Sequence, residues 1–261
     1  MLQIQNVTKT FHPGTQDERV ALDNVSLDVE TGDFITVIGA NGAGKSTLFN
    51  AISGTFRVDR GRIILNGQDI TWMPSHQRSR NIGQLFQDPL KGSAPHMSIE
   101  ENMTLASGRG GWFSHVTRKD REDFRERLRL LGMGLEDRMD QPVGLLSGGQ
   151  RQALTLLMAT FSRPQLLLLD EHTAALDPGT AEKVLELTAK MVREDHLTCL
   201  MVTHNMQSAL DLGNRTLMMN QGRIIFDTRG EERAHLTVSD LLERFRLLNG
   251  AGLDNDRMLL S

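Results

Sequence analysis

The sequence predicts an α/β fold with a mainly parallel sheet, and two observations carry this prediction. First, a short apolar run, Phe34–Ile38, leads into a glycine-rich loop, Gly39–Thr47, and then into residues 48–52, which favour a helix. Second, a run of four leucines ends in two carboxylates, Leu166–Glu171. A run that is apolar at every position is typical of a strand buried on both faces of a parallel sheet.

The glycine-rich loop has the pattern G-x-x-x-x-G-K-[ST] between a strand and a helix, which is the context that a phosphate-binding loop requires. Glycines let backbone N–H groups close around phosphate oxygens, and the helix that follows directs its positive end at the same anion. Lys45 is suited to reach the β- and γ-phosphates and Ser46 to ligate Mg²⁺. The alternative is a glycine-rich turn with a chance Lys-Ser pair, and the flanking strand and helix disfavour it. The sequence therefore predicts a nucleoside triphosphate site.

Three further polar side chains follow predicted strands at the edge where ligands bind in open α/β sheets. Asp170 has the position of a carboxylate coupled to Mg²⁺, and Glu171 is suited to polarise an attacking water. His204 follows an apolar strand, Thr198–Thr203. A lone histidine is more often structural, but its place at this edge makes it a candidate. The alternative for the two carboxylates is a solvated pair at a strand end.

Two other positions are candidates on their chemistry. Ser147 is a natural N-cap in Leu146–Gln150, so this stretch predicts a capped helix start that is suited to an anion. Phe11 opens a predicted loop, residues 11–18. It either anchors the loop or stacks on a base, and its position alone favours the anchor.

The rest of the chain predicts further short elements. From about residue 88 to 145 the pattern becomes helical, which predicts a helical subdomain inserted into the α/β frame. Trp112 and Phe113 lie beside glycines there, and a partner contact and a local loop anchor are equally favoured for them. The predicted strands are 2–8, 20–29, 61–67, 82–87, 215–219 and 223–227; the predicted helices are 74–80, one opening at Ser98, 118–131, one opening at Ser147, 179–194 and one near 237–247.

Composition excludes some classes of function. The chain has 261 residues and a formal net charge of −4, so no bulk positive field favours nucleic acid. Cys199 is the only cysteine, which excludes an intrachain disulfide. No apolar run reaches the length of about 18 residues that spans a bilayer, and the N-terminus lacks the apolar core of a signal peptide. We therefore expect a cytosolic chain whose membrane association comes through a partner.

The order of these motifs resembles the ATP-binding cassette family along almost the whole chain. The order is phosphate loop, a glutamine after a strand, Leu-Ser-Gly-Gly-Gln, Leu-Leu-Leu-Leu-Asp-Glu, Ala-Leu-Asp and then histidine. The resemblance implies one domain, 1–261, with a phosphate-loop core of residues 1–87 and 146–261, an N-terminal antiparallel β subdomain, and the helical insertion at about 88–145. It also implies ATP and Mg²⁺ as ligands and a head-to-tail homodimer with two ATP between the copies.

The resemblance assigns a role to each matching residue. Phe11 resembles the aromatic that stacks on adenine, although many relatives use tyrosine. Glu171 would be the general base, His204 would hold the γ-phosphate and the water, and Asp177 would couple the two sites. The phosphate and Mg²⁺ cradle would be Gly39, Asn41, Gly42, Ala43, Gly44, Lys45, Ser46 and Thr47, with Gln87 and Asp170 at the metal; Ser147, Gly149 and Gln150 would face the γ-phosphate bound by the other copy.

One departure from the family's pattern is His172, where many relatives have proline; we expect it to leave the chemistry unchanged. Glu-His-Thr at 171–173, with Ser93–Met97 upstream, is similar to a group of bacterial importer ATPases. That group implies a membrane permease, a periplasmic or lipid-anchored substrate-binding protein, a place on the cytoplasmic face of the inner membrane, and an amino acid as cargo.

Four rival functions remain at this point. They are the motor of an exporter, a soluble cassette ATPase acting on a ribosome or DNA complex, a regulatory module that holds ATP without turnover, and a small GTPase. The single cassette and the lack of a long coiled-coil insertion disfavour the second rival. Glu171 and His204 disfavour the third, and the absence of an Asn-Lys-x-Asp motif disfavours the fourth.

Overall fold

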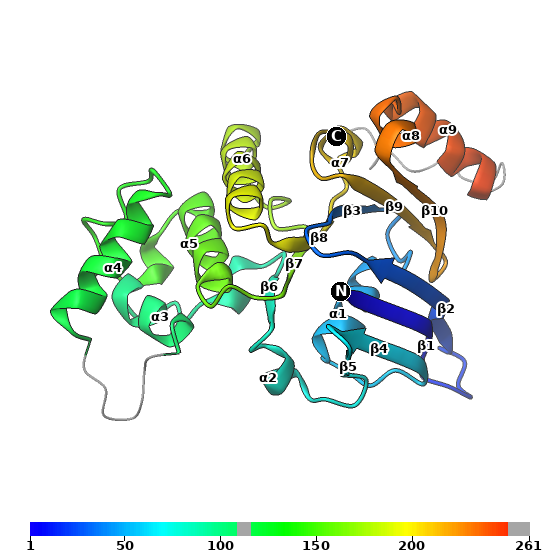
Figure 1. Ribbon diagram of the computed structural model, residues 1–261, viewed down its shortest axis with the longest axis horizontal. Helices are drawn as coiled ribbons and strands as arrows, with labels where there is room; N and C mark the ends of the chain where they lie inside the picture. The colour runs from blue at the N-terminus through cyan, green and yellow to red at the C-terminus, as the bar shows by residue number, and fades with distance from the viewer. Residues whose placement is uncertain (109–115, 250–261) are drawn as a thin grey trace. The chain divides into compact units, whose positions relative to one another are not determined.

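The computed structural model describes residues 1–108 and 116–249. The chain forms two compact units (Figure 1). The first unit combines Met1–Ser79 with Thr198–Ser261, and the second is Arg80–Leu197. The second unit is therefore larger than the helical subdomain of about 88–145 that the sequence analysis predicted. The boundaries of that subdomain at residues 88 and 145 stay a prediction.

An antiparallel sheet occupies the N-terminal part of the first unit, as the sequence predicted. Its strand order is β2-β1-β4-β5. Leu2 of β1 pairs with Val29 on one side and with Leu65 on the other, and all three side chains are buried. The alternation of buried and exposed residues along these strands gives the sheet one apolar face. The four strands are β1 (Leu2–Phe11), β2 (Arg19–Val29), β4 (Arg60–Leu65) and β5 (Gln68–Asp69).

The second sheet of this unit is mainly parallel. Its order is β10-β9-β3-β8, with β3 parallel to both β8 and β9 and only β10 antiparallel. Every residue of β3 is buried, which explains its continuous apolar sequence. The strands are β3 (Phe34–Ile38), β8 (Thr198–Val202), β9 (Arg215–Asn220) and β10 (Arg223–Arg229).

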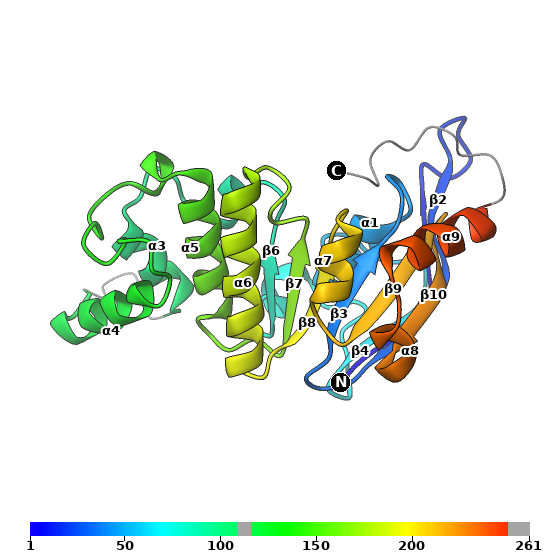
Figure 2. The same cartoon turned by 90° about the horizontal axis from the view of Figure 1, so that it is seen from above.

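The described residues of the first unit also form five helices. Figure 2 shows α7 and α9 on the same side of the mainly parallel sheet. Residues of α7, α9, β3 and β9 share one apolar cluster, which includes Ile38, Met206 and Phe245. The sequence did not predict α7 or α8, which span 6 and 5 residues and are too short for a helical period to show. The helices are α1 (Lys45–Ser53), α2 (Ser75–Arg78), α7 (Met206–Asp211), α8 (Gly230–Ala234) and α9 (Val238–Asn249).

In the second unit, residues 80–108 and 116–197 form one parallel strand pair and four α-helices. β6 pairs with β7 from Ile82↔Leu166 to Leu85↔Leu169. The predicted strand 82–87 therefore ends two residues early, because Asp88 caps a 3-10 turn at this point. The elements are β6 (Ile82–Leu85), η1 (Pro89–Gly92), α3 (Ile99–Ala106), α4 (Arg118–Arg129), η2 (Val143–Leu145), α5 (Gly148–Thr160), β7 (Leu166–Asp170) and α6 (Pro178–Glu194).

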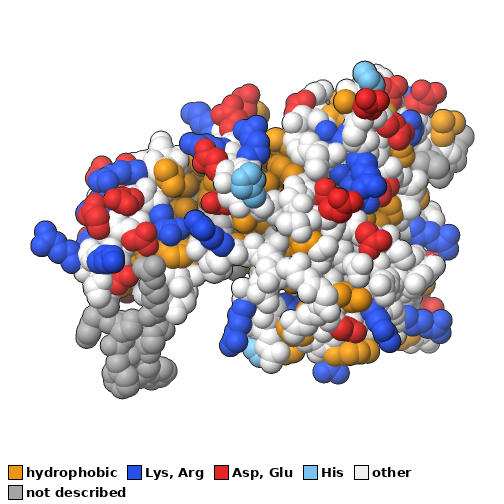
Figure 3. All heavy atoms as spheres, viewed as in Figure 1, with side chains coloured by type: hydrophobic (Ala, Val, Ile, Leu, Met, Phe, Trp, Pro, Cys, Tyr) orange, Lys and Arg blue, Asp and Glu red, His pale blue; other side chains and the backbone are white. Residues whose placement is uncertain are grey.

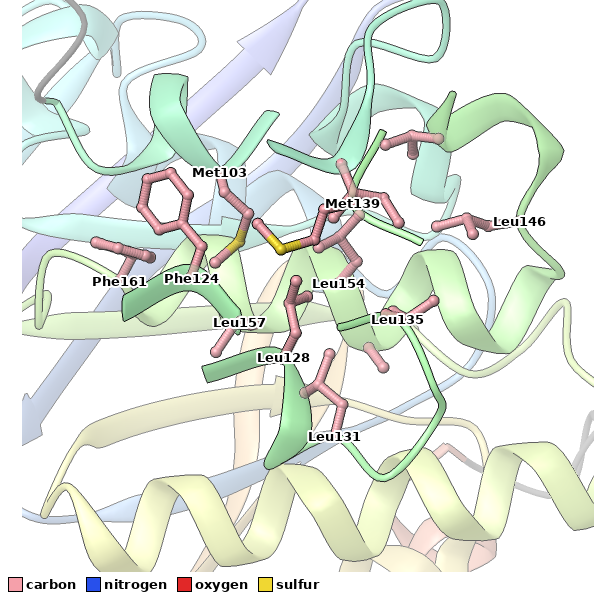
Figure 4. Packing of buried hydrophobic residues seen from close by; sticks show 13 residues of the cluster. Met103, Phe124, Leu128, Leu131, Leu135, Met139, Leu146, Leu154, Leu157 and Phe161 are labelled. Carbon is pink, nitrogen blue, oxygen red and sulfur yellow. The ribbon is translucent and has the colours of Figure 1, made fainter. Parts of the chain in front are cut away.

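The helical part of this unit has its own apolar core (Figure 4). Phe124 and Leu128 of α4 are spaced by four residues and face Met103 of α3 and Leu154 of α5. Phe124 and Phe161 pack edge to face, with ring centroids 5.7 Å apart. The predicted helices from Ser98 and from residue 118 are confirmed. Trp112 and Phe113 lie outside the described residues.

Charge is mixed across the surface. Figure 3 shows positive and negative side chains interspersed on the face in view, and ion pairs such as Arg121–Asp140 and Arg125–Glu122 lie on or near α4. None of the helices in residues 1–108 and 116–249 has the length and apolar character of a bilayer-spanning segment.

Candidate functional site

The predicted phosphate loop joins β3 to α1 in the first unit. Gly39 opens the loop with a φ of 148°, which L side chains rarely adopt. A Cβ built on Gly39 would lie 2.2 Å from the backbone carbonyl oxygen of Met219 in β9. Only glycine fits here, because both the backbone angle and the close approach of β9 exclude a side chain.

Lys45, the first residue of α1, turns back into the loop. Its side chain is only 4 % exposed, and Nζ donates to the carbonyl oxygens of Gly39 at 2.7 Å and Ala40 at 3.1 Å. The positive end of α1 adds to the charge of this ammonium. The loop is therefore preformed around a cation, with Ser46 exposed at the first turn of the helix. This geometry suits a polyphosphate.

Arg19 contacts the same loop, although the sequence analysis did not select it. It pairs with Phe11 across β1 and β2, and its Nη2 donates to the carbonyl oxygen of Gly42 at 2.6 Å. The exposed guanidinium of Arg19 thus links the end of β1, where Phe11 is the candidate for stacking on the base, to the phosphate loop. The sequence carried no signal for this contact, because the predicted strands 2–8 and 20–29 exclude both residues. The prediction that the loop begins at Phe11 is wrong: β1 runs on to Phe11 and β2 begins at Arg19.

Phe11 lies half-buried at the end of β1. Its ring meets Phe56 edge to face, with centroids 5.4 Å apart and planes at 82°. Lys9 Nζ lies 5.6 Å from the Phe11 centroid and 5.5 Å from that of Phe56. These neighbours hold the ring in place, whereas stacking of the ring on adenine stays a prediction.

His204 lies at the same sheet edge as the phosphate loop. The parallel strands β3 and β8 pair at Val37↔Val202, and the backbone N–H of Thr203 donates to the carbonyl oxygen of Val37 at 3.2 Å. The chain leaves β3 into Gly39 and leaves β8 into His204 two residues after this pair. His204 is half-buried there, and its contact with the γ-phosphate stays a prediction.

The far end of α1 is held by Arg78, another residue that the sequence analysis did not select. Its guanidinium is 3 % exposed and donates to the carbonyl oxygens of Ala51 and Ile52 in the last turn of α1, at 2.8 and 2.7 Å. It also donates to the carbonyl oxygens of Met73 and Thr71. These bonds satisfy carbonyls that a helix end leaves without a partner.

Arg78→Met is therefore expected to lower the free energy of unfolding by about 3 kcal/mol, because it leaves several buried carbonyl oxygens unpaired. Urea unfolding of the nucleotide-free protein measures this change. Arg60→Met is the matched control, since Arg60 is exposed on β4 and its loss should change stability by less than about 0.5 kcal/mol. Equal stability of the two variants would contradict the role given to Arg78.

The second unit carries the other candidate residues, and three of them follow its paired strands at one edge. β6 and β7 are parallel and pair at Leu85↔Leu169. Gln87 follows β6 and is exposed, and Asp170 ends β7, half-buried. Glu171 follows directly, with a left-handed φ of 47°. Such a backbone angle is uncommon outside glycine and is concentrated at functional sites.

Residues Leu146–Gln150, called the signature stretch from here on, lead into α5, the signature helix, which begins with a complete capping box. Ser147 Oγ accepts from the Gln150 backbone N–H at 3.3 Å, and the Ser147 backbone N–H donates to Gln150 Oε1 at 3.2 Å. Ser147 and Gly148 are exposed, whereas Gly149 is buried. The helix start is thus ordered and accessible to an anion from outside the unit.

The start of α6 packs against this signature stretch. A Cβ on Gly149 would lie 2.1 Å from Thr180 Cγ2, and one on Gly148 would lie 3.1 Å from Leu176 Cδ2. Asp177 caps α6 by accepting from the Thr180 backbone N–H at 3.1 Å. Hydrogen bonds from Thr180 lower the pKa of the Asp177 carboxyl, so it is ionised at neutral pH.

His172 is buried, with 3 % of its surface exposed. Its Nε2 lies 3.1 Å from Thr188 Oγ1 in α6. Burial lowers the pKa of His172 from 6.5 to about 4, so its ring is neutral in the folded protein at pH 7.

This shift predicts a loss of stability in mild acid. Below pH 6.5 the unfolded chain takes up a proton that the folded protein takes up only near pH 4, so stability falls as the pH falls between these values. The full loss is about 3 kcal/mol. Urea unfolding in EDTA at pH 7 and pH 5 measures most of it. His172→Gln, which does not titrate, should lose about 2 kcal/mol less than the wild type between these pH values; parallel pH profiles would contradict the prediction.

Three of the candidate residues offer oxygen donors that suit Mg²⁺. Mg²⁺ prefers hard oxygen ligands and keeps several waters and substrate phosphate oxygens, so it needs few protein ligands. Ser46 in the first unit, and Gln87 and Asp170 in the second, offer a hydroxyl, an amide oxygen and a carboxylate. These donor types fit Mg²⁺. The part of the chain that the structure describes holds no cluster of three or more His, Cys, Asp or Glu suited to a metal.

A preformed phosphate loop on a mainly parallel sheet, together with a capped Leu-Ser-Gly-Gly-Gln helix start, defines the class of ATP-hydrolysing cassettes. Comparison with known proteins agrees. Residues 22–174 match the family described as ABC transporter, and the chain belongs to this family.

Two relatives extend this likeness over most of the chain. The chain is 41 % identical to a tyrosine transport ATP-binding protein of Clostridioides difficile, with 94 % of this chain and 98 % of that protein covered. It is 36 % identical to a methionine import ATP-binding protein of Shouchella clausii, over 86 % of this chain and 64 % of that protein.

Solved structures show the same fold. A dimeric ATP-binding cassette in a post-hydrolysis state, bound to ADP and phosphate, superposes with a TM-score of 0.76 at 28 % identity and covers 88 % of this chain and 98 % of the other. The chain is thus a cassette ATPase that binds and hydrolyses ATP, with solved relatives that form dimers.

Proposed function

We propose that this chain is the motor of a bacterial importer that carries an amino acid or a solute of similar size. Two copies would join head to tail and drive a membrane permease. The observation that carries the proposal is the division of the phosphate-binding groups. The first unit has the phosphate loop with Lys45 inside it, and the second has a capped helix start that leaves Ser147 exposed. In a head-to-tail dimer, the helix start of one copy would face the phosphate loop of the other.

The hydrolytic step follows from the assigned residues. Water attacks the γ-phosphorus, the bond from that phosphorus to the ADP oxygen breaks, and Glu171 takes the proton from the water. Lys45 and the first N–H groups of the partner's α5 would stabilise the charge that develops on the transferred phosphoryl group. Ser46, Gln87 and Asp170 would hold Mg²⁺, which would supply charge neutralisation at the phosphates. His204 would orient the γ-phosphate and the water.

The relatives support the cargo and the partners. The names of the two relatives above state transport of tyrosine and import of methionine. We therefore propose an amino acid as cargo, a multi-span permease and a periplasmic or lipid-anchored substrate-binding protein as partners, and a place on the cytoplasmic face of the inner membrane. No nucleic acid is proposed as a partner.

The experiment is a pull-down with tagged Glu171→Gln protein and Mg-ATP from detergent-solubilised native membranes. Hydrolysis is blocked in this variant, so the ATP-bound complex should persist. Mass spectrometry identifies the captured chains. A double variant with Lys45→Met is the matched control, because it should not hold ATP and should not stabilise the closed dimer.

Capture of a multi-span permease by the single variant alone supports the importer motor. If the captured permease is encoded without a neighbouring gene for a substrate-binding protein, the result favours an exporter. Capture of ribosomal or DNA-bound proteins would replace the proposal with the soluble cassette ATPase. Uptake of labelled tyrosine and methionine by cells with and without this chain then tests the cargo, and no difference for either amino acid would contradict that part.

A further inference from the structure

His172 lies between Glu171 and the start of α6, at the position where this chain departs from the family's pattern. None of the chemical roles assigned above uses its side chain. His172 follows Glu171 directly and lies almost completely buried in the second unit. A buried polar side chain is retained where a specific partner satisfies it. That partner is Thr188, which is 0 % exposed in the third turn of α6.

The hydrogen bonds fix the direction of this contact. Thr188 Oγ1 lies 2.7 Å from the carbonyl oxygen of Val184, one turn back in α6, so the only hydroxyl proton is donated there. Thr188 Oγ1 can then only accept from His172 Nε2, which lies 3.1 Å away. His172 is therefore the donor in this pair and carries its proton on Nε2, in agreement with its neutral ring.

The helix α6 also holds the C-terminal end of residues 171–177. The chain leaves β7 through Glu171, turns by a backbone bond from the Ala174 N–H to the Glu171 carbonyl oxygen at 3.0 Å, and enters α6 at the Asp177 cap. Residues 171–177 are thus tied to α6 twice, by His172 in the third turn and by Asp177 at the N-terminus. Glu171 lies between the fixed end of β7 and the His172 tie.

The backbone of Glu171 needs such support. Its φ of 47° lies in the left-handed region, which non-glycine residues occupy only where the surrounding structure holds them. A carboxylate that must meet a water within hydrogen-bond distance loses activity when its support moves by a fraction of an ångström.

We propose that His172 is a positioning residue that orients the general base Glu171 through its hydrogen bond to Thr188. This inference rests on the proposed role of Glu171 as general base, and it adds a contact that keeps the Glu171 carboxylate in place. The pair would act on kcat and not on nucleotide binding, because the phosphates are assigned to Lys45 and its loop and Glu171 is assigned only to the attacking water.

The test removes the hydroxyl group of Thr188, which accepts the hydrogen bond from His172, and keeps the volume of the side chain. Thr188→Val replaces the hydroxyl with a methyl group, and Thr188→Ser keeps the hydroxyl as the matched control. For Thr188→Val we expect kcat for ATP hydrolysis to fall about tenfold or more, with Kd for a fluorescent ATP analogue within about twofold of wild type. Thr188→Ser should retain kcat within about threefold. If Thr188→Val gives no folded protein, Thr188→Cys takes its place, since a thiol is a weak acceptor of similar size.

The readouts separate the alternatives. A Thr188→Val protein with a lowered Tm but the wild-type kcat per folded molecule would overturn the proposal, because the pair would then only stabilise the fold. In a Glu171→Gln background, Thr188→Val should cause no further loss of the residual turnover, and a further tenfold loss would also overturn it. If Glu171→Gln alone keeps near-normal turnover, the base assignment fails instead, and the two failures are distinguished.

Discussion

Glu171→Gln is expected to lower ATP turnover by about 10²- to 10⁴-fold, because an amide cannot take the proton from the attacking water. The side chain keeps its size, and glutamine meets the same cost as glutamate at a φ of 47°. ATP binding should persist within about twofold, since the phosphates are assigned to Lys45 and its loop, which the substitution leaves unchanged. Release of inorganic phosphate in the steady state measures turnover.

The same variant should accumulate as an ATP-bound dimer, because hydrolysis is the step that opens it. Analytical ultracentrifugation with Mg-ATP and with Mg-ADP measures this, and only ATP should give the dimer. Glu182→Gln is the charge-matched control on the exposed face of α6 and should keep the wild-type rate. Near-normal turnover of Glu171→Gln would remove Glu171 from the role of base.

The sequence predicted the elements whose signals are local. The bounds of β3 match the prediction because Gly39 ends its apolar run at a point where only glycine fits. The helix that opens at Ser98 has the predicted cap, since Ser98 and Glu101 form a capping box within four residues. The start of α6 is likewise set by the Asp177 cap and the proline that follows it.

The elements that the sequence missed depend on distant contacts. The helix α7 has six residues and little period of its own, and its last carbonyls are held from α8. Arg233 Nη2 lies within hydrogen-bond distance of the carbonyl oxygens of Ala209, Leu210 and Leu212. No pattern within residues 206–211 encodes this partner, which comes more than twenty positions later.

The candidate site divides in the same way. Motif spacing selected Lys45, Ser147 and Glu171, because each lies in a short pattern whose chemistry is local, and the family resemblance added Asp177. Neither selected Arg19, Thr180 or Thr188, which reach the site from other elements by packing. For His172, the sequence led us to expect no effect on the chemistry, and its contact with Thr188 leads instead to the positioning proposal.

Gly149→Ala should lower ATP turnover by about a hundredfold, because the added Cβ would lie 2.1 Å from Thr180 Cγ2. The Thr180 methyl group cannot simply rotate away, since both the hydroxyl and the backbone N–H of Thr180 bond to Asp177 at the start of α6. The signature helix must therefore shift, or the α6 cap must break. Both changes displace groups that face the second copy, whereas ATP binding by a single copy should stay within about twofold of wild type.

Rescue by Thr180→Ser tests the cause of this loss. Serine lacks Cγ2 and keeps the backbone N–H and the hydroxyl, so the double variant should recover to within about tenfold of wild type, and Thr180→Ser alone should be nearly wild type. If the double variant stays as inactive as Gly149→Ala, the added methyl group acts on the bound nucleotide and not on Thr180. That outcome would assign the need for glycine at 149 to close approach of the γ-phosphate, whereas recovery assigns it to the packing of the signature helix on α6.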